Sequence, residues 1–188
     1  MSLSPADRQY LLGLAREAIA GHLRGEPPPS VDLNAISEGL RHEGASFVTL
    51  TKHGVLRGCI GSLEPLRSLV LDVRENAVAA AFDDPRFPPV SAEELGDLHV
   101  EISVLSSPQP LSYDGPDDLI AKLRPGVDGV VIERGWNRAT FLPQVWEKMP
   151  DPRQFLEHLC LKAYLPADAY RHPGLEVHTY QVEKFEEE

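Results

Sequence analysis

The chain has 188 residues, a length that fits one ordinary domain with or without a small appendage. Its hydrophobic fraction of 42% and charged fraction of 25% are typical of a globular protein with a real core. The net charge of −11 argues against nucleic-acid binding, because the basic field that supplies most of that affinity is missing. Part of this charge lies in the final run EKFEEE (183–188), which we expect to be a solvated end.

The sequence gives no sign of a membrane span or of export. No segment approaches the roughly 18 apolar residues that a spanning helix needs. The N-terminal stretch reaches Asp7 and Arg8 too early for a signal peptide. Cys59 and Cys160 form neither a disulfide framework nor a CxxC pair. We therefore expect a protein of the reducing cytoplasm, with no membrane contact.

The first half of the chain predicts helices on either side of a β-hairpin. Capping residues, turn residues and the spacing of apolar positions mark the boundaries. The expected elements are a helix from Ser4 to before GEPPPS (25–30), strands over 45–51 and 55–63 joined by the turn KHG (52–54), and a helix over 66–82. A short turn at SAEEL then follows, with Ser91 as its cap and Glu94 in the capping-box position. An alternating strand over 98–105 comes next, with Glu101 on its outward face.

The second half repeats this order. A hairpin is predicted over 128–145 around the turn RGW, and a helix over 152–164. Aligning Gly54 with Gly135 places Arg57 on Arg138 and Cys59 on Thr140.

We interpret this order as an internal duplication of a hairpin-and-helix unit. The two hairpins could then pair in one antiparallel sheet flanked by helices, an α+β fold. The last strand, over 176–184, would lie near a sheet edge.

Cys59 is the first candidate for chemistry. It lies in LRGCIG (56–61) between Gly58 and Gly61, and Arg57 would share its face in a regular strand. A catalytic cysteine needs access and a nearby cation to form its thiolate, and the glycines would let a substrate approach the backbone. The alternative is a small buried residue beside glycines that a bulge requires. Cys160 lies on an apolar helical stripe and is expected to be inert core.

The loop DDPRFPP (83–89) is the second candidate. Prolines stiffen it on both sides of Arg86 and Phe87, and Asp84 is pushed away from helical geometry by the proline after it. A rigid loop with an acid, a base and an aromatic ring suits ligand binding. In the alternative interpretation Arg86 pairs with Asp83 or Asp84, and Phe87 fills the core.

Glu101 gains interest only if its face looks toward Arg57 and Cys59, where a carboxylate could act as a base or metal ligand. The seven histidines show no HxH or HxxxH spacing, so no metal site is predicted. The chain has neither GxxxxGK[ST] nor GxGxxG, and we expect no cofactor.

Several segments together resemble one known family. They are LRGCIGSLEP, AAAFDDPRFPPVSAEEL, VEISVLS, PGVDGVVIERGWNRATFLPQVW and FLEHLCLKAYLP, in this order over about residues 8 to 182. By these motifs the chain is identified as a member of the AMMECR domain family, known in bacteria and archaea as AmmeMemoRadiSam system protein A. The resemblance implies one domain of this type with an α+β fold, an antiparallel sheet and a smaller subdomain.

The resemblance also implies partners and a functional patch. The family is associated with a Memo-like protein and a radical SAM protein, and its signature hexapeptide falls on Leu56–Gly61 here. Ser62-Leu63 stands where many relatives carry Thr-Phe.

These observations leave three hypotheses open. In the first, the protein is an enzyme or enzyme component acting on a small molecule or a modified macromolecule, with Cys59 as nucleophile or redox thiol. Arg57 would bind an anion or activate the thiol, and Asp84 or Glu101 would orient a group or accept a proton. In the second, the RGCIG patch docks a partner protein without catalysis. In the third, the patch is purely architectural.

Overall fold

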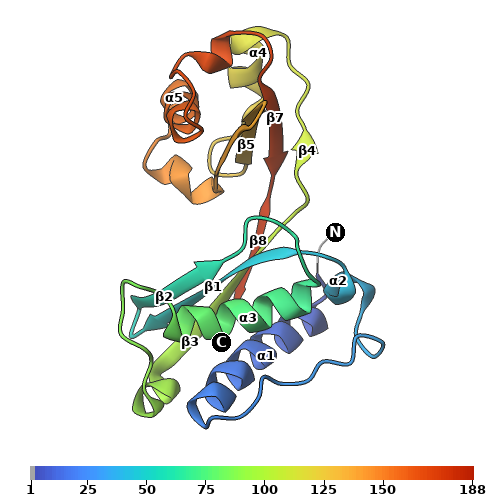
Figure 1. Ribbon diagram of the computed structural model, residues 1–188, viewed down its shortest axis with the longest axis vertical. Coiled ribbons are helices and arrows are strands. Elements are labelled where there is room, and N and C mark those ends of the chain that lie inside the picture. Colours follow the sequence, from blue (N-terminus) through green and yellow to red (C-terminus); the bar gives the residue numbers. More distant parts are fainter. Residues whose placement is uncertain (1–2) are drawn as a thin grey trace. The chain divides into compact units, whose positions relative to one another are not determined.

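The computed structural model describes residues 3–188 and divides the chain into two compact units (Figure 1). Unit 1 consists of two segments, the residues up to Ser106 and the C-terminal Glu183–Glu188. Unit 2 comprises Ser107–Val182 between them in the sequence. None of the helices in residues 3–188 combines the length and the apolar character that crossing a membrane requires.

Unit 1 contains a sheet with the strand order β2-β1-β3-β8. Its elements are α1 (Pro5–Leu23), α2 (Glu38–Arg41), β1 (Ala45–Lys52), β2 (Val55–Gly61), α3 (Leu69–Phe82), the 3₁₀ helix η1 (Ala92–Asp97), β3 (Leu98–Leu105) and β8 (Val182–Glu186). Strand β1 pairs antiparallel with both β2 and β3. The predicted hairpin is thus confirmed, and its turn places His53 and Gly54 at positive φ.

Helices α1 and α3 pack against one face of this sheet (Figure 1). Alternate residues of the strands enter their core, among them Val48, Leu50, Val100 and Ile102, none more than 1% exposed. Because side chains alternate along a strand, the residues between them lie on the opposite face. That second face carries Thr49, Cys59 and Glu101.

Helix α3 begins at Leu69, later than the predicted Leu66. Two backbone hydrogen bonds hold the preceding residues extended: the Gly44 N–H donates to the Arg67 carbonyl, and the Leu69 N–H donates to the His42 carbonyl. Leu66 is 81% exposed and lies outside the helix. The amphipathic pattern alone could not reveal this pairing.

Unit 2 contains a second sheet with the order β4-β7-β5-β6. Its elements are β4 (Gln109–Pro110), α4 (Gly115–Lys122), β5 (Gly129–Arg134), β6 (Asn137–Phe141), η2 (Pro143–Glu147), α5 (Pro152–Lys162), η3 (Ala169–Arg171) and β7 (Glu176–Tyr180). The core includes Trp146 stacked on Phe155, with ring centroids 3.7 Å apart.

The α+β class is confirmed, but three details of the expected arrangement are wrong. The two hairpins belong to separate sheets, not one. The strand expected over 176–184 is divided at Gln181 into β7 of one sheet and β8 of the other. The charged run at the C-terminus is not simply solvated, because it forms β8 and buries Phe185 in the core of unit 1.

Phe185→Ala should lower the free energy of unfolding of unit 1 by about 3 kcal/mol, because it empties a buried aromatic site. Urea titrations followed by far-UV circular dichroism would measure this loss. Trp136 and Trp146 are the only tryptophans of the chain and both lie in unit 2, so their fluorescence follows that unit. Deletion of the exposed Glu188 is the control. An unchanged dichroism midpoint for Phe185→Ala would contradict the packing described.

Candidate functional site

A row of polar side chains crosses the open face of the unit 1 sheet. Thr49 of β1 pairs with Cys59 of β2 on one side and with Glu101 of β3 on the other. Side chains that are paired in this way lie on the same face. The Thr49 hydroxyl lies 3.2 Å from the Cys59 Sγ, and Lys184 Nζ of β8 lies 2.7 Å from Glu101 Oε2. The row therefore presents a thiol, a hydroxyl, a carboxylate and an ammonium group.

The backbone of Cys59 is held by two charged side chains. Its N–H donates to Asp84 Oδ2 at 2.9 Å, and Arg86 Nη2 donates to its carbonyl at 3.3 Å. Arg86 and Asp84 are themselves joined by bonds of 2.9 and 2.7 Å, and Asp84 is only 4% exposed. Strand β2 is an edge strand, whose outward N–H and C=O would otherwise be open to another strand. The Asp84–Arg86 pair caps this edge at Cys59.

The electrostatics of this pair follow from its geometry. The hydrogen bond from Arg86 is the main reason that the pKa of the Asp84 carboxyl is far below its usual range, against burial that would raise it. The hydrogen bonds to Asp84 in turn raise the pKa of Arg86. Arg86 is therefore a cation close to this sulfur.

Arg57 does not serve the thiol as expected. A bulge separates the pairs Leu50–Gly58 and Thr51–Leu56, so the strand is not regular at Arg57. Its guanidinium forms bonds of 3.0 and 2.9 Å to Glu94 and also donates to the Pro88 and Pro89 carbonyls. The side chain is only 12% exposed. Arg57 thus fastens the segment 88–94 to β2.

The two glycines of the motif serve close packing, not substrate access. A Cβ at Gly58 would collide with the Ala80 carbonyl of α3, and one at Gly61 would lie 2.6 Å from the Ser46 carbonyl oxygen and against the Phe47 ring. Any larger residue would force these elements apart. These two positions of the motif are therefore glycines because neighbouring residues of unit 1 occupy the space that a side chain would need.

Glu101 lies two strands away from Cys59, a backbone separation of about 10 Å at the usual strand spacing. Its carboxylate is bound by Lys184. The position does not support its expected role as a base for the thiol.

Phe87 is half-buried and lies under the Arg86 guanidinium, 5.4 Å from its ring centroid. Of the predicted residues, the structure therefore brings Asp84 and Arg86 directly to Cys59. Arg57 and Glu101 are held by partners of their own.

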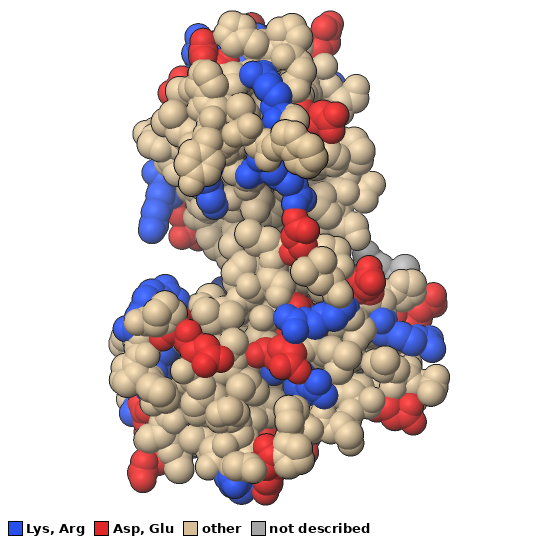
Figure 2. Space-filling view, in the orientation of Figure 1, with Lys and Arg blue, Asp and Glu red and all other residues tan. Residues whose placement is uncertain are grey.

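Thr49 was not among the residues predicted for the site, and Glu94 was predicted only as a capping residue. The signal for Thr49 was present, because the hairpin turn fixes the register that pairs it with Cys59. Glu94 does accept the Ser91 N–H as a capping-box residue, but it also binds Arg57 and Lys52. The site charges are thus paired within the chain, and Figure 2 shows acidic and basic side chains side by side on the face of unit 1 that it displays.

Cys160 is fully buried, and burial raises the pKa of its thiol. This agrees with the expected core position. In residues 3–188, no three His, Cys, Asp or Glu side chains are grouped in a way that could hold a metal ion.

Substitution of Glu94 tests whether its ion pair with Arg57 stabilises unit 1. The bonds from Arg57 are the main cause that lowers its pKa from 4.5 to about 2. A carboxyl with a lowered folded pKa adds stability above its unfolded pKa and loses it as the pH falls through the folded value. Glu94→Gln should therefore cost about 1.5–3 kcal/mol at pH 7, the range for hydrogen bonds to charged groups.

The difference in free energy of unfolding between Glu94→Gln and the parent should shrink as the pH falls from 4.5 toward 2. Urea titrations at pH 7, 5, 4 and 3 would follow it, with Glu147→Gln at an exposed position as control. A difference that stays constant down to pH 3 would exclude the charged pair as its cause.

Comparisons with known proteins agree with the motif. The AMMECR1 family model matches residues 12–185. A protein of Methanothermobacter thermautotrophicus is 43% identical over 187 residues, which cover 99% of this chain and 97% of that protein. A protein of Thermofilum pendens is 39% identical over 200 residues, 98% of this chain and 92% of the other.

A solved structure is also similar. The crystal structure of the uncharacterized protein PH0010 from Pyrococcus horikoshii matches with a TM-score of 0.77 and 36% identity, covering 95% of this chain and 90% of that one. Together, the match over residues 12–185 and the similarity over nearly the full length show that this chain belongs to the AMMECR1 family.

Proposed function

We propose that this protein is a component of a cytoplasmic enzyme system and that it presents the thiol of Cys59 on the open face of the unit 1 sheet. The observation that carries this proposal is the clamp at Cys59. A buried carboxylate and a guanidinium hold its backbone N–H and C=O, while its side chain remains partly exposed. A functional side chain is positioned accurately when neighbouring residues hold its backbone through hydrogen bonds, as Asp84 and Arg86 do here.

Two polar groups lie beside the thiol. Thr49 donates a hydrogen bond to the sulfur, and the Arg86 guanidinium, which bonds to the Cys59 carbonyl, lies close by. The set lacks a base, because the carboxylates of Asp84, Glu94 and Glu101 are bound to cations. We therefore assign Cys59 the role of a nucleophile. Its sulfur forms a bond to an electrophilic carbon of the substrate, the leaving group departs with the electron pair of the broken bond, and a base on a partner protein takes the thiol proton.

The family resemblance suggests which partners these are. We propose that the Memo-like and radical SAM proteins of the same system act on the group that Cys59 receives. A small molecule or a modified macromolecule would be the shared substrate.

A second candidate function is docking without chemistry. The observation that favours it is the same pairing of charges, since Glu101 with Lys184 and His99 with Glu186 form a patterned polar surface on the open face. A partner could read this surface through complementary charges.

Alkylation kinetics test the thiol. Iodoacetamide near neutral pH should modify Cys59 at least as fast as free cysteine and more than 10-fold faster than Cys160, a difference of about 1.4 kcal/mol in activation free energy. Peptide mass spectrometry measures both sites in one sample, and the buried Cys160 is the internal control. Thr49→Val should slow the reaction of Cys59, whereas Thr49→Ser should preserve it. Equal, slow labelling of both cysteines would sink the proposal.

Partner capture separates the two functions. We expect the tagged protein to retain the Memo-like or radical SAM partner, and Lys184→Glu to weaken this capture at least 10-fold if the open face docks the partner. Cys59→Ser should leave docking intact but abolish the activity of the assembled system. Lys148→Glu, at an exposed lysine of unit 2, is the matched control. Failure of the wild-type chain to retain either partner would contradict the proposed assembly.

A further inference from the structure

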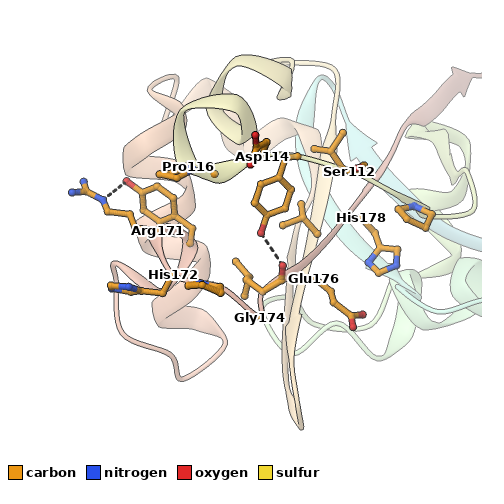
Figure 3. A pocket seen from close by; sticks show the side chains of 16 residues that line it. Ser112, Asp114, Pro116, Arg171, His172, Gly174, Glu176 and His178 are labelled. Atoms are coloured by element: carbon orange, nitrogen blue, oxygen red, sulfur yellow. Dashed lines mark hydrogen bonds between the residues drawn. The ribbon is translucent and has the colours of Figure 1, made fainter.

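We propose that unit 2 contains a separate binding pocket for a small planar aromatic molecule. The inference goes beyond the function proposed for Cys59, which belongs to unit 1. The pocket lies between two segments of unit 2, residues 110–116 and 170–178, and has a volume of about 710 Å³ (Figure 3). Ligand pockets typically have volumes of about 300–1,000 Å³.

The two walls are joined across the pocket by one side chain. The Tyr113 hydroxyl, from the first wall, donates to the Leu175 carbonyl of the second wall at 2.7 Å. Burial is the main cause that raises the pKa of this phenol. The hydrogen bond fixes the direction in which the Tyr113 side chain points, so the pocket presents an aromatic surface with little χ1 entropy left to lose.

The second wall is also held in place. Arg134 Nη2 donates to the Ala169 carbonyl at 2.8 Å and to the carbonyls of His172 and Pro173 at 3.4 Å. The hydroxyl of the buried Tyr170 accepts a bond of 3.1 Å from Arg171 Nε. Both tyrosine hydroxyls are thus already engaged inside the chain.

The apolar side chains that line the pocket determine which class of ligand it can bind. Besides the two tyrosines it is lined by Leu111, Leu175, Val177 and the rings of Pro110, Pro116 and Pro173. A charged group placed among these side chains would lose its hydration without gaining partners. A flat apolar ring would instead pack against the partly exposed Tyr113 ring and the proline rings, which favours an aromatic molecule over an aliphatic one.

The polar groups lie around the rim. Arg171 and His172 lie at one end of the pocket, and Ser112 and His178 at the other (Figure 3). His172 is bound to Asp168 at 3.1 Å, whereas Arg171 lies 3.7 Å from Glu157, donates to the Tyr170 hydroxyl and stacks over the Tyr170 ring. Because Asp114 and Glu176 line the rim as well, it carries both signs of charge. We infer that the ligand has hydrogen-bonding substituents on its edge but no net charge.

Heteronuclear NMR on the full chain tests this site with indole as the probe and cyclohexanol as the aliphatic comparison. Indole should cause saturable shifts at residues 110–116 and 170–178, with at least 10-fold weaker binding of cyclohexanol. Tyr113→Ala should weaken indole binding about 10-fold, equal to about 1.4 kcal/mol. Tyr113→Phe keeps the ring and should change the affinity by less than about threefold, which separates stacking from loss of the wall contact.

Two control variants distinguish binding in this pocket from binding elsewhere on the protein. Trp136 is fully exposed in the same unit, so Trp136→Ala should leave binding unchanged unless indole simply stacks on surface rings. Cys59→Ser should also leave it unchanged, which distinguishes this site from the thiol site. Absence of saturable shifts up to millimolar indole, or binding that survives Tyr113→Ala but not Trp136→Ala, would overturn the proposal.

Discussion

The carboxylate of Asp84 joins the two parts of unit 1 on which the family motif depends. It accepts the N–H of Cys59 on β2 and two bonds from the Arg86 side chain, so the edge strand and the proline-rich loop become one rigid body. Without it, the outward N–H of an edge strand would be open to other chains. RGCIG and DPRFPP are therefore two halves of one structural unit in this chain.

One part of this arrangement recurs in unit 2, where a cation also binds a carbonyl of an edge strand. Thr140 lies three residues from the paired hairpin end, as Cys59 does once the bulge at Arg57 is allowed for. Its carbonyl accepts a bond of 2.9 Å from Lys162, in the position that Arg86 takes at Cys59. The register thus supports the alignment of Cys59 with Thr140, but not that of Arg57 with Arg138. An edge strand of this design needs a capping cation, and it does not need a thiol.

Local patterns predicted the local structure of this chain, and tertiary contacts decided the rest. Turn residues and alternation correctly predicted both hairpins, because those signals act within a few residues. The division of 176–184 between two sheets left no local trace, since Gln181 is an ordinary polar residue. Likewise, the two-residue spacing of Arg57 and Cys59 suggested a shared face, and only the bulge opposite Leu50 and Thr51 shows why Arg57 turns to Glu94.

The return of the chain to unit 1 has a consequence for biosynthesis. Strand β8 is translated after all the other strands and helices of residues 3–188, yet it belongs to the same sheet as β1. While the ribosome makes unit 2, strand β3 has no partner on its outer side and the site of Phe185 in the core is empty. Domains that are contiguous can fold as they emerge, N-terminal one first. Here the sheet of unit 1 must wait for residues 182–186, so it is completed only after unit 2 has been made.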